Sequence, residues 1–500
     1  MLYDNYKVLI LYPNPRKMSL VPSSIAIFAE LLVNLGVNVD LFDASLFKQN
    51  EFEDADEYLE KFLAVKPFMN KLTDKVSYDE TDVFDAFNYK IDDFQPDLIA
   101  VTCVESTFEY AISLLKSINS KKILTILGGV FATFSPEYAL SYNEIDLVCV
   151  GEGENSIVKL VQSLIKDNDI CMVPNIYYKK DGKIIKNPIS PLLSLNDIPV
   201  GDYNIFHEKR FYRAMAGKIY KMFPVETHRG CLNKCTFCNS PLQNRFYQNK
   251  TKQIYYRTKS IEKVHKQIKY FVDNFKAEYF FFWADNFFSY STKQIESFCD
   301  MYSDFRIPFF CQSYPSNISE NKLQMLVDVG LKRIGVGIEH GNEEFRRKLI
   351  KRNYSNKTVI EKMDIVKKYD LEFSTNNIIG FPGETPELVM DTIELNRTIQ
   401  PHSASCSIFA PFRGTALREL CLNKGFIEND NILAPSNDVK SILNMPNFPK
   451  DAIEGKRRTF AFYLKFPRKM WNEISLAEKL TPEGDKIWLR LQKKYCEQFK

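Results

Sequence analysis

Three closely spaced cysteines are the residues of this sequence most clearly suited to chemistry. The chain has 11 cysteines, and Cys231, Cys235 and Cys238 follow one another at short intervals. The remaining cysteines are scattered along the chain. Three thiolates at this spacing can hold three irons of a cubane iron–sulfur cluster, and the missing fourth protein ligand leaves one iron open. Gly230, directly before the first cysteine, lets the backbone turn tightly around a metal. The triplet therefore predicts a redox-active iron–sulfur cluster.

A zinc site is the alternative interpretation of the triplet. Zinc sites usually combine paired C-x-x-C halves or add histidines at short spacing. Neither feature accompanies these cysteines in the sequence. The remaining alternatives to a redox-active cluster are a zinc site that lacks its fourth ligand and a chance grouping of cysteines.

Length and charge limit the class of protein that carries the triplet. A chain of 500 residues predicts about three domains. Lys and Arg number 66 and Asp and Glu 63, and this near balance argues against a nucleic-acid partner or a polybasic membrane anchor. No apolar run approaches the roughly 20 residues of a transmembrane segment, and the first residues lack the layout of a signal peptide. We expect a cytoplasmic protein, where clustered cysteines indicate metal or redox chemistry.

The first part of the chain alternates short apolar runs with helical patterns. Such alternation predicts an α/β fold with a doubly wound, Rossmann-like sheet. The strand-like runs cover residues 8–12, 37–42, 97–102, 123–127 and 146–150. We assign residues 1–187 to this domain. Three prolines then punctuate a linker, which we place at residues 188–219.

A second alternation follows the linker and carries the cysteine triplet. Six strand-like runs separated by helical patterns predict a partial (β/α)6 barrel over residues 220–425, with its chemistry at the C-terminal ends of the strands. The cysteines directly follow the first of these runs, which ends at Glu226. The aromatic run Tyr279–Trp283 is expected to be mainly barrel core, because a parallel strand is buried on both faces, with the lining of an apolar substrate cavity as the alternative for part of it. Residues 426–500 predict a mainly helical C-terminal cap.

The cysteine motif in this context resembles that of the radical S-adenosylmethionine (SAM) superfamily. The resemblance implies a [4Fe-4S] cluster whose open iron binds SAM, cleavage of SAM to a 5′-deoxyadenosyl radical, and an electron donor such as flavodoxin or ferredoxin. It places SAM contacts after successive barrel strands. These contacts are Phe237, Asp285, Asn286, Glu339, Gly380, Gly383 and Glu384. The sequence departs from the family's Gly-Gly-Glu type of loop at residues 284–286, where it has Ala-Asp-Asn.

Two glycine-rich turns mark the ligand side of the first domain. One begins at Gly128-Gly129 and the other is Gly151-Glu-Gly-Glu154, and both follow predicted strands, where open sheets bind ligands. Neither G-x-G-x-x-G after a strand nor a phosphate-binding loop is present, so dinucleotide and ATP binding lose support. Such a domain ahead of the barrel resembles the cobalamin-binding radical SAM proteins, and the resemblance runs from about Tyr6 to Leu422. It implies cobalamin contacts at Thr102, Glu105, Ser106, Gly128, Gly129, Val130, Phe131, Gly151, Glu152, Gly153 and Glu154.

The distribution of histidine and arginine bears on the cobalt. All five histidines lie at or after His207, so a histidine from the first domain cannot bind the lower face of a cobalamin. Weakly ligated cobalt would give up a methyl group more readily. Arg16, the only arginine before Arg210, lies after the first strand, and we place it as a hypothesis beneath the corrin.

These features favour a cobalamin-dependent radical SAM methyltransferase that moves a methyl group from methylcobalamin to an unactivated carbon. The substrate is expected to be a small molecule, a natural product or a lipid-like compound. The same architecture catalysing a cyclisation or rearrangement is the first alternative, because the motifs do not separate the two reactions. An iron–sulfur redox sensor or scaffold without turnover is the alternative from another class.

Overall fold

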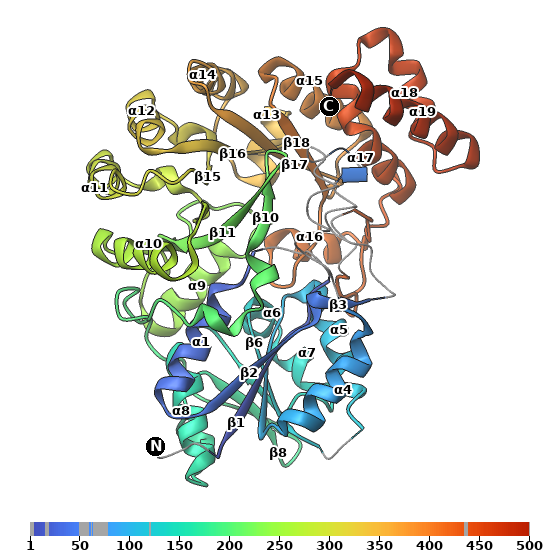
Figure 1. The fold of residues 1–500 in the computed structure, drawn as a ribbon. Helices are drawn as coiled ribbons and strands as arrows, with labels where there is room; N and C mark the ends of the chain where they lie inside the picture. The colour runs from blue at the N-terminus through green and yellow to red at the C-terminus, as the bar shows by residue number, and fades with distance from the viewer. Residues whose placement is uncertain are drawn as a thin grey trace.

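The computed structural model describes residues 5–15, 20–49, 60–61, 63, 79–119, 122–434 and 439–499. Two sheets, each with its own helices, and a C-terminal group of helices make up the described part of the chain (Figure 1). The first sheet and its helices, coloured blue to teal, lie below the barrel, coloured green to orange. The red C-terminal helices lie beside the last barrel strands.

The first sheet contains five parallel strands and an antiparallel hairpin. Its order is β2 (Asn38–Asp43), β1 (Lys7–Tyr12), β5 (Leu98–Thr102), β6 (Leu124–Gly128), β7 (Leu147–Cys149), β8 (Ile176–Lys180) and β9 (Lys183–Lys186). The five predicted strands are therefore present. The chain leaves β1 in one direction to β2 and later returns on the other side to β5. This reversal creates a crevice beyond the carboxyl ends of β1 and β5, the usual ligand position of an open sheet.

Helices cover both faces of this sheet, as the doubly wound prediction requires. One face packs against α1 (Ser23–Asn34) and α8 (Glu154–Ile165). The other packs against α4 (Val83–Phe94), α5 (Glu105–Lys116), α6 (Val130–Phe134) and α7 (Pro136–Leu140). The inner strands β1, β5, β6 and β7 are mostly buried because both of their faces meet helices.

The second sheet is a half-barrel of six parallel strands with one antiparallel strand at its edge. Its order is β10 (Tyr212–Met215), β11 (Lys218–Glu226), β14 (Tyr279–Trp283), β15 (Phe309–Ser313), β16 (Leu331–Glu339), β17 (Glu372–Ile379) and β18 (Ser403–Ile408). Its connecting helices are α9 (Ser240–Thr251), α10 (Ile261–Phe275), α11 (Thr292–Tyr302), α12 (Glu320–Val329), α13 (Glu343–Phe345), α14 (Asn356–Lys367), α15 (Pro386–Ile399) and α16 (Ala416–Asn423). All six predicted strands are present. Strand β10 was not predicted, because its short run has no clear apolar alternation.

Strand β14 shows how the half-barrel separates its two faces. Phe280 and Phe282 point outwards into the largest core, between the sheet and its helices. Phe281 lies on the opposite, concave face, in a small cluster with Met222 and Phe310. Trp283, at the end of the strand, is 50% exposed. Most of the run is therefore core, as expected, whereas Trp283 lies at the open end of the strand on the concave face.

Smaller elements connect the domains. A two-stranded ribbon of β12 (His228–Arg229) and β13 (Arg257–Thr258) lies on either side of the cysteine loop and α9 in the sequence. A second short ribbon pairs β3 (Phe47–Lys48) with β4 (Asp79–Asp82). The C-terminal region contains α17 (Lys450–Lys465), α18 (Trp471–Ala477) and α19 (Pro482–Phe499), which share a core with β17, β18 and α15. No helix of the described residues is long and apolar enough to cross a membrane.

Candidate active site

The three cysteines lie together at the C-terminal ends of the barrel strands. They belong to the loop between β12 and α9, where Cys235 is buried and Cys231 and Cys238 are partly exposed. All three line a cavity of about 150 Å³. The rest of its lining consists of Asn233, Phe237, Ser240, Pro241, Asp285, Gln312, Ser313, Tyr314, Gly335, Gly337, Glu339, Arg352 and Asn376. The fold thus assembles the cysteines with residues from several consecutive barrel strands, as expected for the mouth of a barrel enzyme.

The thiols of this cavity can each bind one iron of a cluster. Among the described residues, no three His, Cys, Asp or Glu side chains converge as the ligands of one metal ion would. In a cubane cluster each cysteine binds a different iron, so such convergence is not required. Burial raises the pKa of the Cys231 thiol, and it raises the pKa of Cys238 to about 11. Because iron binds the thiolate form, loading the cluster has to displace these protons.

A buried ion pair forms part of the cavity wall beside the cysteine loop. Glu339 ends β16 in the left-handed backbone region, with φ of 63°, and its carboxylate lies 3.1 Å from Arg352 Nη2. Arg352 Nε also donates to the Cys235 sulfur at 3.3 Å, and Nη1 donates to the Gly337 carbonyl at 2.6 Å. Burial raises the pKa of Glu339, while the positive charge of Arg352 opposes that shift. A carboxylate and a guanidinium thus lie beside the cysteines, ready for polar groups of a ligand.

Arg352 and Tyr314 were not identified from the sequence. Arg352 follows a short helical segment after β16, and the Tyr314 ring lies beneath its guanidinium at 4.8 Å from the ring centre. No local pattern distinguishes Arg352 from the neighbouring basic residues Arg346, Arg347, Lys348 and Lys351. The only available signal was its position shortly after a barrel strand.

Residues after β14 define another side of the cavity. Asp285 accepts a hydrogen bond from Ser240 Oγ at 2.7 Å and so links this loop to the start of α9. Asn286 is buried and does not line the cavity; its amide oxygen accepts from the Tyr314 backbone nitrogen at 3.2 Å, and its amide nitrogen donates to Asn317. Of these two predicted SAM contacts, Asp285 faces the cavity, whereas Asn286 holds the next loop in place.

The loop after β17 supports the cavity from behind. Glu384 and His340 are both 0% exposed, and His340 Nε2 lies 2.9 Å from Glu384 Oε1. The other carboxylate oxygen accepts from the backbone nitrogens of Gly380, at 2.5 Å, and Phe381, at 3.0 Å. Neither Glu384 nor the predicted Gly380 and Gly383 lines the cavity. Both oxygens of Glu384 are engaged within the protein, so this side chain joins the loops after β16 and β17.

The crevice of the first domain presents small and partly exposed groups. Thr102 and Ser106 are partly exposed, Gly129 is exposed, and Val104 beside them is 45% exposed. Val104 is an exposed apolar side chain just after β5, and Gly128 and Gly129 nearby leave the backbone uncovered by side chains. Such a surface suits the apolar face of a large flat ligand. The chemistry of this crevice therefore fits a cobalamin. Gly128, Val130 and Gly153 are also at least partly exposed.

Other predicted cobalamin contacts point elsewhere. Phe131 is buried, with its ring 4.7 Å from that of Phe108 in the core beneath α5. Glu105 is also buried and accepts from the Arg413 backbone nitrogen at 2.8 Å, with Arg418 Nη1 at 3.4 Å. Its side chain joins the first domain to the loop after β18. Arg16 lies outside the described residues.

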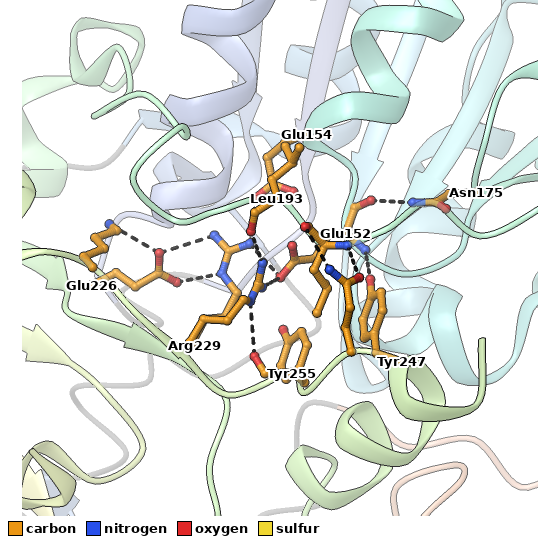
Figure 2. A network of polar contacts seen from close by, with 12 residues as sticks. Glu152, Glu154, Asn175, Leu193, Glu226, Arg229, Tyr247 and Tyr255 are labelled. Carbon is orange, nitrogen blue, oxygen red and sulfur yellow. Dashed lines mark hydrogen bonds and ion pairs between the residues drawn. The ribbon is translucent and has the colours of Figure 1, made fainter. Parts of the chain in front are cut away.

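Glu152 and Glu154 reach from the first domain to the barrel. Figure 2 shows both carboxylates beside Arg229, two residues before the first cysteine of the triplet. Arg229 Nη1 lies 2.9 Å from Glu152 and 2.8 Å from Glu154. Gly151 has φ of 90°, and a Cβ there would lie 2.5 Å from the Tyr247 hydroxyl, so only glycine allows this turn to approach α9.

Comparison with known proteins agrees with both halves of the site. Residues 225–395 match the radical SAM superfamily, and residues 75–161 match the B12 binding domain. These two matches and the cysteine cavity define a radical SAM enzyme with a B12-binding domain. The chain thus contains a radical SAM domain and a B12-binding domain, which imply a [4Fe-4S] cluster, SAM and cobalamin as cofactors.

Relatives of known name support the same family. An uncharacterized methyltransferase of Pyrococcus horikoshii is 25% identical over 388 residues, which cover 76% of this chain and 81% of the relative. An anaerobic magnesium-protoporphyrin IX monomethyl ester cyclase of Rubrivivax gelatinosus is 24% identical over 363 residues, which cover 69% of this chain and 61% of the cyclase. The cobalamin-dependent SAM radical enzyme OxsB, solved with aqua-cobalamin and SAM, has a TM-score of 0.65 at 15% identity and covers 98% of this chain and 71% of its own. This last likeness establishes the shared fold.

Proposed function

We propose that this enzyme is a methyltransferase that moves a methyl group from methylcobalamin to an unactivated carbon of a small-molecule substrate. One observation carries the proposal: buried ion pairs of Arg229 with Glu152 and Glu154 join the loop that bears the cysteines to the B12-binding domain of the same chain. A radical-generating site and a methyl carrier can then act on the same bound substrate. The methyltransferase name of the Pyrococcus horikoshii relative supports the transfer of a methyl group.

The cofactors supply the difficult chemistry when bound: the cluster reduces SAM to release a carbon radical, and cobalamin carries the methyl group. The residues of the chain bind and orient. Cys231, Cys235 and Cys238 would hold the cluster, and the Glu339–Arg352 pair would meet polar groups of SAM. Asp285 would receive a positively charged group such as the amino group of SAM.

The concave face of the half-barrel supports an apolar substrate. Phe281 and Phe310 lie on this face with ring centres 4.6 Å apart, and half-exposed Trp283 follows Phe281 at 5.7 Å. These rings continue towards the open end of the strands, where the cysteine loop lies. Aromatic surfaces of this kind bind apolar or flat molecules. We therefore propose a natural-product or lipid-like substrate.

The products of SAM test the proposal. The protein is purified without oxygen, its cluster is rebuilt, and cobalamin binding is followed by absorbance before candidate substrates are added. Methylation predicts S-adenosylhomocysteine and 5′-deoxyadenosine together with a methylated product. The variant with Cys231, Cys235 and Cys238 all changed to Ala serves as the control and should form no 5′-deoxyadenosine. A cluster that forms without any SAM cleavage would instead support a redox sensor or scaffold.

Radical cyclisation is the second candidate, and the cyclase name of the Rubrivivax gelatinosus relative favours it. Cyclisation predicts 5′-deoxyadenosine without S-adenosylhomocysteine, so the same assay separates the two reactions.

The surroundings of the enzyme follow from its chemistry. None of the described cysteines forms a disulfide, which suits a reducing compartment such as the cytoplasm. Reduction of the cluster requires an electron donor, for which a flavodoxin or a ferredoxin is the proposed partner.

A further inference from the structure

Six charged side chains gather where the first domain meets the barrel. We call them the junction cluster: Glu152, Glu154, Glu226, Arg229, Arg257 and Lys259. Every one of these side chains is 16% exposed or less. The two first-named carboxylates come from the loop after β7, taken as residues 151–154 so that it includes the first residue of α8, and the other four groups come from the barrel domain. Figure 2 shows Arg229 between Glu226 on one side and Glu152 and Glu154 on the other.

Arg229 binds both domains with a single guanidinium. Its Nε lies 3.0 Å from Glu226 of the barrel, while Nη1 reaches Glu152 at 2.9 Å and Glu154 at 2.8 Å. Hydrogen bonds between charged partners are about twice as strong as those between neutral partners. Because these groups are buried, dissolved salt screens their attraction only weakly. Glu226 thus holds Arg229 from within the barrel domain, through Nε and also through Nη2 at 3.3 Å, while the docked loop after β7 supplies both carboxylate partners of Nη1.

The ribbon β12–β13 brings two like charges together. Arg229 and Arg257 are direct cross-strand partners in this ribbon. Like charges at opposed positions destabilise a strand pair. Glu152 relieves this repulsion because one of its oxygens contacts both guanidinium groups. The ribbon of the barrel domain thus relies on a carboxylate supplied by the other domain.

The charges balance only across the junction. On the barrel side, Arg229, Arg257 and Lys259 face Glu226 alone, which leaves an excess of positive charge. The loop after β7 contributes two carboxylates and no cation. Since buried charges must be paired, the two sides complement each other when docked and leave uncompensated charge when apart.

The cysteine loop is attached to this cluster at two points. Arg229 is separated from Cys231 by one residue. On α9, Asn244 Nδ2 donates to the Cys231 carbonyl at 2.8 Å, and the Tyr247 hydroxyl accepts from the Glu152 backbone nitrogen at 2.6 Å. A displacement of the loop after β7 would therefore act on Cys231 through the ribbon and through the helix.

We propose that Glu152 and Glu154 order the cysteine loop through Arg229, so that docking of the cobalamin-binding domain and the geometry of the cluster site depend on each other. Arg229, which does not line the cysteine cavity, is then a positioning residue. The proposal concerns the protein itself, and only its kinetic consequence rests on the proposed methyl transfer. That consequence is tight coupling, in which SAM is cleaved productively only when the methyl-carrying domain is in place.

Glu152→Gln and Glu154→Gln test the proposal, because glutamine keeps the size of the side chain and removes its charge. Glu478→Gln is the matched control, since Glu478 forms a similarly buried ion pair with Lys456 among the C-terminal helices, 2.7 Å apart. Hydrogen–deuterium exchange is measured on the full chain before the cluster is rebuilt, for peptides that cover residues 228–240. Exchange there should accelerate, by about tenfold for Glu152→Gln. Glu154→Gln should have a smaller effect, because Glu154 contacts one arginine and Glu152 contacts two.

A second measurement uses the enzyme with its cofactors. The ratio of 5′-deoxyadenosine to methylated product should rise in the order parent, Glu154→Gln, Glu152→Gln, and stay at the parent value in Glu478→Gln. Unchanged exchange of residues 228–240 in both junction variants would overturn the proposal, as would an equal change in Glu478→Gln. If the parent forms no methylated product, methyl transfer is refuted, while the exchange experiment still decides the inference. If Glu152→Gln does not fold, Glu154→Gln and its control carry the test.

Discussion

Glu384 provides a decisive test of how the site is supported, because the hydrogen-bond partners of both its carboxylate oxygens are groups of the protein itself. His340 must donate from Nε2, since its Nδ1 accepts from the Asn342 backbone nitrogen at 3.0 Å. The opposite oxygen accepts from two backbone N–H groups of the loop after β17. All three donors therefore require acceptors, which a carboxylate supplies on both sides.

Glu384→Gln disturbs this arrangement without creating a cavity. Whichever way the amide is turned, its NH2 group faces at least one donor, and His340 cannot change its tautomer without losing the bond from Asn342. One buried donor left without a partner costs about 1–3 kcal/mol, and loss of the charge weakens the remaining bonds. We expect the free energy of unfolding of the barrel domain to fall by about 2–4 kcal/mol.

Urea unfolding followed by intrinsic fluorescence measures this loss, together with SAM binding at temperatures where the variant stays folded. Glu387→Gln is the control, because Glu387 is exposed in the first turn of α15, directly after this loop, and should change the free energy by no more than about 0.5 kcal/mol. If Glu384→Gln keeps the parent's stability but loses SAM affinity, Glu384 contacts the ligand directly and the supporting role is refuted.

Three further predictions concern other parts of the fold. Burial raises the pKa of Glu226, but the positive charges of Arg229 and Lys259 outweigh burial and lower this pKa to about 2. The ionised Glu226 therefore stabilises the fold above the ordinary pKa of 4.5, and this stabilisation is lost as the pH falls towards 2. Glu226→Gln should flatten the pH dependence of the free energy of unfolding between these values, and an equally steep profile would contradict the assignment. Gly151→Ala should destabilise by about 1–3 kcal/mol in thermal unfolding, because its backbone is left-handed and a Cβ would collide with α9; a neutral effect would show that the turn is not so constrained. Phe282→Ala should cost about 3–5 kcal/mol, whereas Trp283→Ala should cost about 1 kcal/mol or less and mainly raise KM; similar losses of stability would refute the separation of the two faces of β14.

The order of elements could be predicted from the sequence because it depends on local patterns. Apolar runs of strand length, separated by helical spacing, identified all the parallel strands of both sheets. The cysteine triplet was equally clear, since its ligands come from one short loop and need no distant partner. The glycine-rich turns Gly128-Gly129 and Gly151–Glu154 were found at strand ends for the same reason.

The roles of individual side chains were decided by tertiary structure. Glu154 and Arg229 lie 75 residues apart, and nothing near either one announces that they pair across the domain junction. Arg352 joins the cysteine cavity only because the loop after β16 folds back towards the loop after β12. A local pattern fixes where a turn or strand falls, but a buried charge takes its role from whichever opposite charge the packing of distant segments brings within reach.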